Sequence, residues 1–178
     1  IIAPTSFMDH SVSENVYAGT AMQRRAMYMY GTILPRDEKG MVDNGLGKYP
    51  SVGRASLIAP TIDINQTGQN LTIDGVKMQF QYTTNTEAPV EMNIWFPNHK
   101  ALFMAENCVG TLHNILTLRG AQVRDPLSWA RFLDQSLELY GDKAEVVFTA
   151  HNWPRFGNDK VVELLENQRD MYKYINDQ

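Results

Sequence analysis

Cysteine is almost absent from this sequence of 178 residues, and long hydrophobic runs are absent altogether. The single cysteine, Cys108, excludes an internal disulfide and a zinc site built from several thiolates. The longest apolar runs, at 101–105 and 146–150, are far too short to span a bilayer. Neither sign of charge dominates, because the net charge is only −4, so a basic surface for nucleic acid or for an anionic membrane is not expected.

What the composition does contain is typical of a globular domain. Hydrophobic residues make up 43% and charged residues 20%, which is enough apolar material for a core. The first residue, Ile1, is not a methionine, and no basic or signal-like apolar segment follows it. The last residue, Gln178, lies in a polar, helix-like stretch. We therefore expect the chain to be part of a longer one, although a mature secreted chain can also begin without methionine.

The spacing of apolar residues predicts three helices. In the first, over residues 11–30, they recur every three or four positions and Gly31 follows the last turn. Residues 32–54 are rich in glycine and proline, which predicts a long loop of the kind that often borders a functional site. Two further helices are predicted, one running from Asp125-Pro126 to Gly141 and one capped by Asn158.

Alternation of apolar and polar residues predicts the strands. A hairpin is expected around Asp74-Gly75, a strong two-residue turn signal, with strands at 71–73 and 76–82. The continuous apolar run at 101–105 suits a strand buried on both faces. Further strands are expected at 92–96 and 144–150. Without internal repeats or low-complexity segments, these elements predict a layered α/β fold with a helix at each end.

Three residues with metal-binding side chains follow predicted strands. Glu87 lies in the loop after 76–82, Glu106 directly follows 101–105, and His151 directly follows 144–150. Loops beyond the carboxyl ends of strands commonly form sites in open α/β sheets, and zinc accepts carboxylate and imidazole when thiolate is lacking. On this pattern alone, solvated glutamates and a structural histidine are the simpler interpretation.

Several segments, in order along nearly the whole chain, resemble the alkylsulfatases of the metallo-β-lactamase superfamily. The segments nearest to the three candidate ligands are TEAP at 86–89, MNIWFP at 92–97, MAENC at 104–108 and HNWP at 151–154. The others are FMDHSVSEN at 7–15, AMQRRA at 21–26, TLRGA at 117–121 and the end of the chain from 168 to 178.

The resemblance implies zinc-dependent hydrolysis of alkyl sulfate esters to alcohol and sulfate. It implies two zinc ions in the complete enzyme, with Glu87, Glu106 and His151 as ligands and Glu106 close to both ions. Glu91 is the competing carboxylate and is expected to be structural. The implied fold is part of an αββα sandwich over residues 1–157, with 158–178 beginning a helical dimerisation region of a homodimer.

The resemblance also assigns residues to the substrate. Asn114 and Arg119 are expected to contact the sulfate, and His113 to give a proton to the leaving oxygen. Simpler roles stay open: Arg119 could pair with Asp125 or a carbonyl group, His113 could be a packed core histidine, and Asn114 could cap a turn.

One hallmark of the superfamily, a His-x-His-x-Asp-His run, is missing from the sequence. None of the four histidines, at positions 10, 99, 113 and 151, forms it. Glu87, Glu106 and His151 alone are therefore expected to hold one zinc ion or none. Two hypotheses follow. The chain is one part of an alkylsulfatase whose N-terminal half supplies the other ligands, or it is a non-catalytic, self-associating piece of one. Family members that are periplasmic or secreted in bacteria suggest the same location here.

Overall fold

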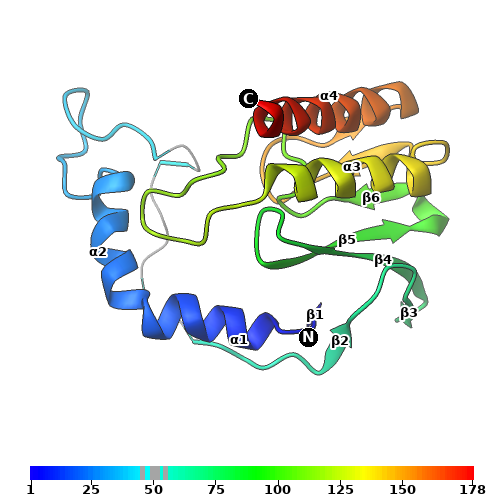
Figure 1. The fold of residues 1–178 in the computed structure, drawn as a ribbon, viewed down its shortest axis with the longest axis horizontal. Coiled ribbons are helices and arrows are strands. Elements are labelled where there is room, and N and C mark those ends of the chain that lie inside the picture. Colours follow the sequence, from blue (N-terminus) through cyan, green and yellow to red (C-terminus); the bar gives the residue numbers. More distant parts are fainter. Residues whose placement is uncertain (45–46, 49–52, 54–55) are drawn as a thin grey trace.

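The computed structural model describes residues 1–44, 47–48, 53 and 56–178, and its centre is a mixed sheet (Figure 1). Within this sheet β6 and β7 pair in parallel, and the other neighbouring strands pair antiparallel. The six strands lie in the order β3 (Asn70–Ile73), β4 (Val76–Thr84), β5 (Val90–Phe96), β6 (Ala101–Phe103), β7 (Val146–Phe148) and β8 (Arg155–Phe156).

This topology determines which loops meet. Since β5 is antiparallel to both β4 and β6, and β7 is parallel to β6, the strands β4, β6 and β7 all run in one direction. Their carboxyl ends therefore lie at the same edge of the sheet. The loops that follow these three strands contain the three predicted metal ligands.

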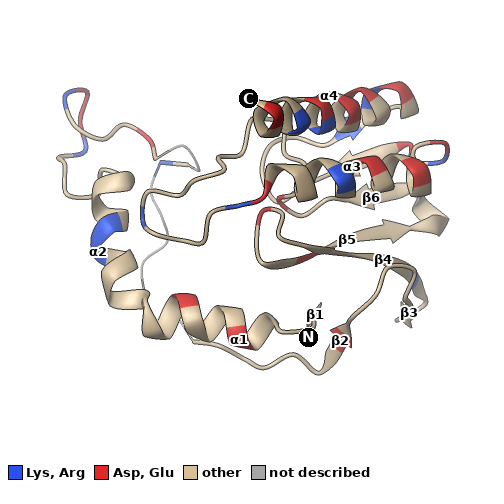
Figure 2. Ribbon diagram, viewed as in Figure 1, with Lys and Arg blue, Asp and Glu red and all other residues tan. Residues whose placement is uncertain are grey.

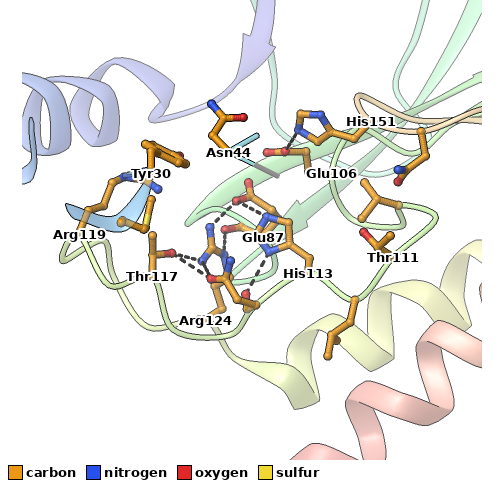
Figure 3. A pocket seen from close by; sticks show the side chains of 15 residues that line it. Tyr30, Asn44, Glu87, Glu106, Thr111, His113, Thr117, Arg119, Arg124 and His151 are labelled. Atoms are coloured by element: carbon orange, nitrogen blue, oxygen red, sulfur yellow. Dashed lines mark hydrogen bonds and ion pairs between the residues drawn. The ribbon is translucent and has the colours of Figure 1, made fainter. Parts of the chain in front are cut away.

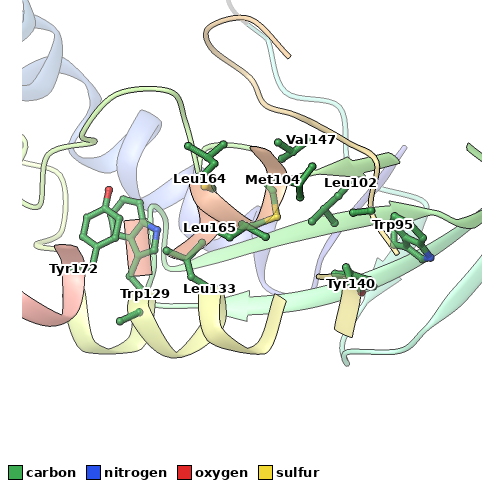
Figure 4. Close-up of a cluster of buried hydrophobic side chains, with 14 residues drawn as sticks. Trp95, Leu102, Met104, Trp129, Leu133, Tyr140, Val147, Leu164, Leu165 and Tyr172 are labelled. Carbon is green, nitrogen blue, oxygen red and sulfur yellow. The ribbon is translucent and has the colours of Figure 1, made fainter. Parts of the chain in front are cut away.

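Two helices, α3 (Pro126–Tyr140) and α4 (Asn158–Asp177), cover one face of the sheet (Figure 1). The core between them and the sheet includes Trp129, Leu133 and Leu165, all almost inaccessible to solvent (Figure 4). Trp129 stacks on Tyr172 of α4 with ring centroids 4.1 Å apart. Burial of each such side chain contributes about 1.5–3 kcal/mol. Residues of α4 are thus part of this core. The assignment of 158–178 to a dimerisation region stays a prediction.

The two helix starts show how local and distant contacts compete. At α3 the prediction is confirmed, because the Asp125 carboxylate accepts hydrogen bonds from the backbone N–H groups of Leu127 at 2.9 Å and Ser128 at 3.1 Å. The predicted cap at Asn158 is wrong. Gly157 precedes the first turn of α4, and the Asn158 side chain instead donates to the carbonyl groups of the α3–β7 connection, Gly141 at 2.7 Å and Ala144 at 2.9 Å.

The predicted strands are found with shifted ends. The hairpin is confirmed, with Asp74 and Gly75 both at positive φ, 50° and 80°, as a two-residue turn between right-twisted strands requires. The predicted strand at 92–96 begins two residues earlier. The predicted strands at 101–105 and 144–150 are shorter, and β6 ends at Phe103 because the chain turns at Ala105, whose φ is 47°.

The N-terminal segment lies on the other side of the sheet from α3 and α4 (Figure 1). A short parallel pair, β1 (Ile2–Pro4) with β2 (Ile62–Ile64), leads into α1 (Phe7–Val12), the π-helical η1 (Ser13–Tyr17) and α2 (Gly19–Met29). The predicted helix thus begins earlier than residue 11 and has a π-helical break. Gly31 has a φ of 67°, which confirms its place after the last turn.

The rest of the described chain is connecting structure. Residues 32–44 of the predicted long loop contain no helix or strand, whereas Gly45, Pro50 and Arg54 lie outside the described residues. A short 3₁₀ turn, η2 (Pro97–His99), links β5 to β6. Both acidic and basic residues occur along α3 and α4 (Figure 2). Among the described residues, no helix combines the length and apolarity needed to cross a bilayer.

Candidate metal and anion site

The predicted site residues converge on one pocket at the carboxyl ends of β4, β6 and β7 (Figure 3). The pocket has a volume of about 450 Å³ and lies between the sheet edge, the loop after β6 and the end of α2. All six residues selected from the sequence line it, and they come from three segments of the chain: Glu87, Glu106, His113, Asn114, Arg119 and His151.

Two carboxylates and one imidazole form the most compact group in this pocket. Ligand atoms of Glu87, Glu106 and His113 all lie within 4.8 Å of one another. His151, the third ligand expected from the sequence, is in direct contact through Nε2 with Oε1 of Glu106 but is not part of that group. Among the described residues the geometry therefore offers two candidate imidazoles for one pair of carboxylates.

The backbone is bent sharply beside each predicted ligand. Non-glycine residues adopt positive φ next to them: Asn85 at 55° before Glu87, Ala105 at 47° before Glu106, and Asn152 at 72° after His151. Such conformations are uncommon for residues with a Cβ atom and are concentrated at functional sites. The side chains of all three predicted ligands line the common pocket.

A third carboxyl group, Glu91, lies close to Glu87 and Glu106 at this edge. Burial raises the pKa of Glu91 to about 8, and the nearby charges of Glu87 and Glu106 act in the same direction. Three carboxylates this close repel one another unless a proton or a cation lies between them. The donor set, oxygen with imidazole nitrogen, fits zinc or a similar divalent cation.

Arg124, which the sequence did not single out, is the main positive partner of this cluster. Its Nη2 lies 2.5 Å from Oε1 of Glu87, and its Nε donates to the Glu87 carbonyl oxygen, also at 2.5 Å. The other guanidinium nitrogen contacts Thr117 and Asn114. Nothing in the local sequence marks this arginine, because Glu87 lies 37 residues away and becomes a neighbour only in the folded chain.

Arg119 lies at another wall of the pocket and does not pair with Asp125. Its Nη2 forms an ion pair with Oε1 of Glu14 in η1 at 3.2 Å. Arg25 of α2 donates weakly to the Arg119 carbonyl oxygen at 3.5 Å. The N-terminal helical segment therefore holds the orientation of this arginine, whose guanidinium has further donors left for an anion.

The His113 side chain is mostly buried, with 16% of its surface exposed. Its ring lies against Trp129 with centroids 5.6 Å apart, and its Nδ1 is 3.0 Å from the Asn114 carbonyl oxygen. Because a carbonyl oxygen only accepts, Nδ1 must carry the proton, which leaves Nε2 facing Glu87 at 3.6 Å. Nε2 can thus act as a metal ligand or, when protonated, as a proton donor.

Contacts with α4 and with the loop after β7 hold the loop after β6 in place. Tyr172 of α4 donates to the His113 carbonyl oxygen at 3.2 Å, and the Gly110 N–H donates to Oδ1 of Asn152 at 2.9 Å. A Cβ atom at Gly110 would lie only 3.1 Å from the Asn152 side chain, so glycine permits this close approach. The loops that carry Glu106 and His151 are thereby linked directly.

Comparison with solved structures defines the fold first. A metallo-β-lactamase family protein from Thermus thermophilus matches 98% of this chain and 52% of its own with a TM-score of 0.58, and its 14% identity shows likeness of fold alone. The stereoselective inverting sec-alkylsulfatase Pisa1 from Pseudomonas sp. matches 99% of this chain and 28% of its own with a TM-score of 0.95 and 46% identity. The chain has the metallo-β-lactamase type of α/β fold.

Comparison of sequences defines the family. A linear primary-alkylsulfatase from Pseudomonas sp. is 50% identical over all 178 residues, and the alkyl/aryl-sulfatase BDS1 from Saccharomyces cerevisiae is 46% identical over the same length. The match covers 26% of the first and 28% of the second. No family model matches. The chain therefore belongs with the alkylsulfatases of the metallo-β-lactamase superfamily, and it spans about a quarter of the length of the curated relatives it matches.

Proposed function

We propose that the protein containing this chain hydrolyses alkyl sulfate esters to alcohol and sulfate at a zinc centre. The observation that carries this proposal is the convergence of carboxylates, imidazoles and arginine side chains on one pocket at the carboxyl ends of β4, β6 and β7. Relatives named as alkylsulfatases, near half identical along the whole chain, support it.

The ligands proposed for zinc from this chain are Glu87, Glu106 and His151. Zinc, when bound, supplies an activated hydroxide near neutral pH and neutralises charge on the sulfate oxygens. Glu106 contacts His151 and lies within the compact group with Glu87, so it would hold the metal together with these residues. A second ion needs further nitrogen donors, which the sequence does not provide through a His-x-His-x-Asp-His run.

The anion side of the pocket is proposed to bind the sulfate group. Asn114 and Arg119 provide an amide and a guanidinium as hydrogen-bond donors, and charge-assisted bonds to an anion are stronger than neutral ones. His113 is proposed to donate a proton from Nε2 to the leaving alcohol oxygen. Its position fits this role, because Nδ1 is already engaged with Asn114 and Nε2 faces the carboxylates that would surround the metal.

The test uses the natural full-length protein that contains this chain. Zinc content is measured by elemental analysis and sulfate release from dodecyl sulfate by ion chromatography, in the wild type and in Glu106→Ala. We expect bound zinc and turnover in the wild type, and loss of at least about two orders of magnitude in turnover in the variant. The matched control is Glu138→Ala, an exposed glutamate on α3, which should behave like the wild type. Absence of zinc and of sulfate release in the folded wild type would refute the proposal.

The second candidate function is self-association without catalysis. It rests on large apolar side chains that are exposed at several places, among them Tyr17 at 85%, Tyr28 at 76% and Trp153 at 91%. Homodimer formation is compatible with either function. Sedimentation analysis together with the sulfate assay separates them, because an associating protein without turnover would favour the second candidate.

A further inference from the structure

Arg124 lies between the proposed metal ligand Glu87 and the proposed sulfate donor Asn114, and contacts both. Its side chain is only 7% exposed, and the Glu87 side chain that it contacts is 12% exposed. A guanidinium so nearly buried requires charged or polar partners for all of its donors, because an unpaired buried charge is strongly destabilising. Its contacts therefore indicate what it is built to hold.

On the metal side, Arg124 engages Glu87 twice. Nη2 binds the carboxylate oxygen Oε1 and Nε binds the main-chain carbonyl of the same residue, both at 2.5 Å. Two parallel contacts to one residue fix its side chain and its backbone together. The guanidinium therefore fixes the orientation in which the Glu87 carboxylate faces Glu106 and His113.

On the anion side, the same guanidinium orients an amide. Nη1 donates to Oγ1 of Thr117 at 2.5 Å and to Oδ1 of Asn114 at 3.1 Å. The Thr117 hydroxyl then donates to Oδ1 of Asn114 at 3.2 Å. Since both donors engage the amide oxygen, the amide nitrogen Nδ2 of Asn114 is the group that can donate to a bound anion.

The main chain of Arg124 also closes the loop that carries Arg119. The Arg124 N–H donates to the Ile115 carbonyl oxygen at 3.1 Å, so residues 115–124 form a closed loop. A displacement of Arg124 would thus reach Glu87, Asn114 and the base of this loop at the same time.

We propose that Arg124 is a positioning residue that couples the metal ligand Glu87 to the sulfate donor Asn114. Its guanidinium donates to Glu87, Asn114 and Thr117, and it would act on the metal and the anion through these residues. It presents one carboxylate oxygen of Glu87 to the metal and the amide nitrogen of Asn114 to the anion. This inference rests on the proposed function and adds a residue whose removal weakens both binding events.

The test compares Arg124→Met and Arg124→Lys in the natural full-length protein purified with its zinc. Three quantities are measured: zinc affinity by chelator competition, the inhibition constant of inorganic sulfate in zinc-saturated protein, and the thermal midpoint. For Arg124→Met we expect zinc affinity to fall about 10- to 100-fold, the usual effect of removing a residue that orients a metal ligand. We expect sulfate inhibition to weaken about tenfold at saturating zinc.

Lysine separates charge from geometry. It keeps a positive charge near Glu87 but lacks the planar fork that reaches Glu87 and Asn114 together. Arg124→Lys should therefore recover most of the zinc affinity while sulfate inhibition stays weak. The matched control is Arg131→Met, on the exposed surface of α3, which should leave all three quantities unchanged.

Each outcome decides the inference. Loss of zinc affinity with normal sulfate inhibition would reduce Arg124 to a simple partner of Glu87 and overturn the coupling. Arg124→Met that matches Arg131→Met would also overturn it, while leaving the proposed function intact. If Arg124→Met does not fold, Arg124→Lys decides, and a lysine variant equal to wild type in both affinities overturns the inference. A wild type without zinc or turnover refutes the proposed function and the inference with it.

Discussion

Replacement of Asn107 by alanine should destabilise the protein, because it removes a buried amide next to the site. Asn107 directly follows Glu106 and is buried between the sheet and α3. Its amide nitrogen donates to Oδ1 of Asn93 at 2.9 Å and to Oγ1 of Thr83 at 3.1 Å. These two contacts belong to a buried polar network that continues through Gln81 to Ser136 of α3.

The magnitude follows from the groups left unpaired. Without the Asn107 amide, the buried Oδ1 of Asn93 loses its donor, which costs about 1–3 kcal/mol. The Thr83 hydroxyl loses one contact but can rotate, so its loss is at the low end, about 0.5–1 kcal/mol. Oδ1 of Asn107 has no partner among the described residues, and its removal returns part of the loss. The expected net destabilisation is about 2 kcal/mol.

The assay is urea denaturation followed by tryptophan fluorescence, with zinc affinity measured on the same samples. Trp129 is a suitable reporter, because its indole N–H donates to the Asn107 carbonyl oxygen at 2.6 Å. Zinc affinity should also fall, since the loop that carries Glu106 loses its anchor. The control is Asn167→Ala at an exposed position of α4. An unfolding free energy for Asn107→Ala within about 0.5 kcal/mol of that control would refute the reasoning.

Two further predictions concern single side chains. His151→Ala and His113→Ala should differ in zinc content and turnover. We expect His151→Ala to lose zinc, and His113→Ala to keep zinc but turn over slowly. Loss of zinc in His113→Ala with retained zinc in His151→Ala would make His113 the ligand. Burial raises the pKa of the Cys108 thiol from 9.0 to about 12, so the folded state binds this proton more tightly than the unfolded state. Its contribution to stability is complete below about pH 9 and is lost as pH rises toward 12, by up to about 1.4 kcal/mol per pH unit. Urea midpoints from pH 8 to 11 should therefore fall more steeply in the wild type than in Cys108→Ala, and equal slopes would contradict this.

Local features of the sequence determined several parts of the structure. The Asp74-Gly75 turn, the Asp125 cap of α3 and the glycine after α2 all have the predicted conformation. Each depends on bonds and backbone preferences within a few residues, which the sequence shows directly. The resemblance to the family marked six of the residues that line the pocket, because such a resemblance records the outcome of folding in relatives.

Other features were decided only when distant segments came together. Asn158 does not cap its own helix, because its side chain instead donates to the carbonyl groups of Gly141 and Ala144 after α3. The buried polar network through Gln81 and Asn107 contradicts the simple alternation expected for a strand, because α3 supplies partners for the buried amides. The hydrogen bonds within the network then offset the cost of burying these amide groups, each of which alone would favour water.

The site shows the same division. Glu87, Glu106 and His151 were identifiable from the sequence as residues that follow strands, but the sequence did not show that His113 would join the two carboxylates. It also contained no sign of Arg124, whose partners lie between 7 and 37 residues away. The sequence by itself identified six of the side chains that line the pocket. The parallel run of β4, β6 and β7 brought them to one edge of the sheet, and only there do burial and charge decide which of them pair.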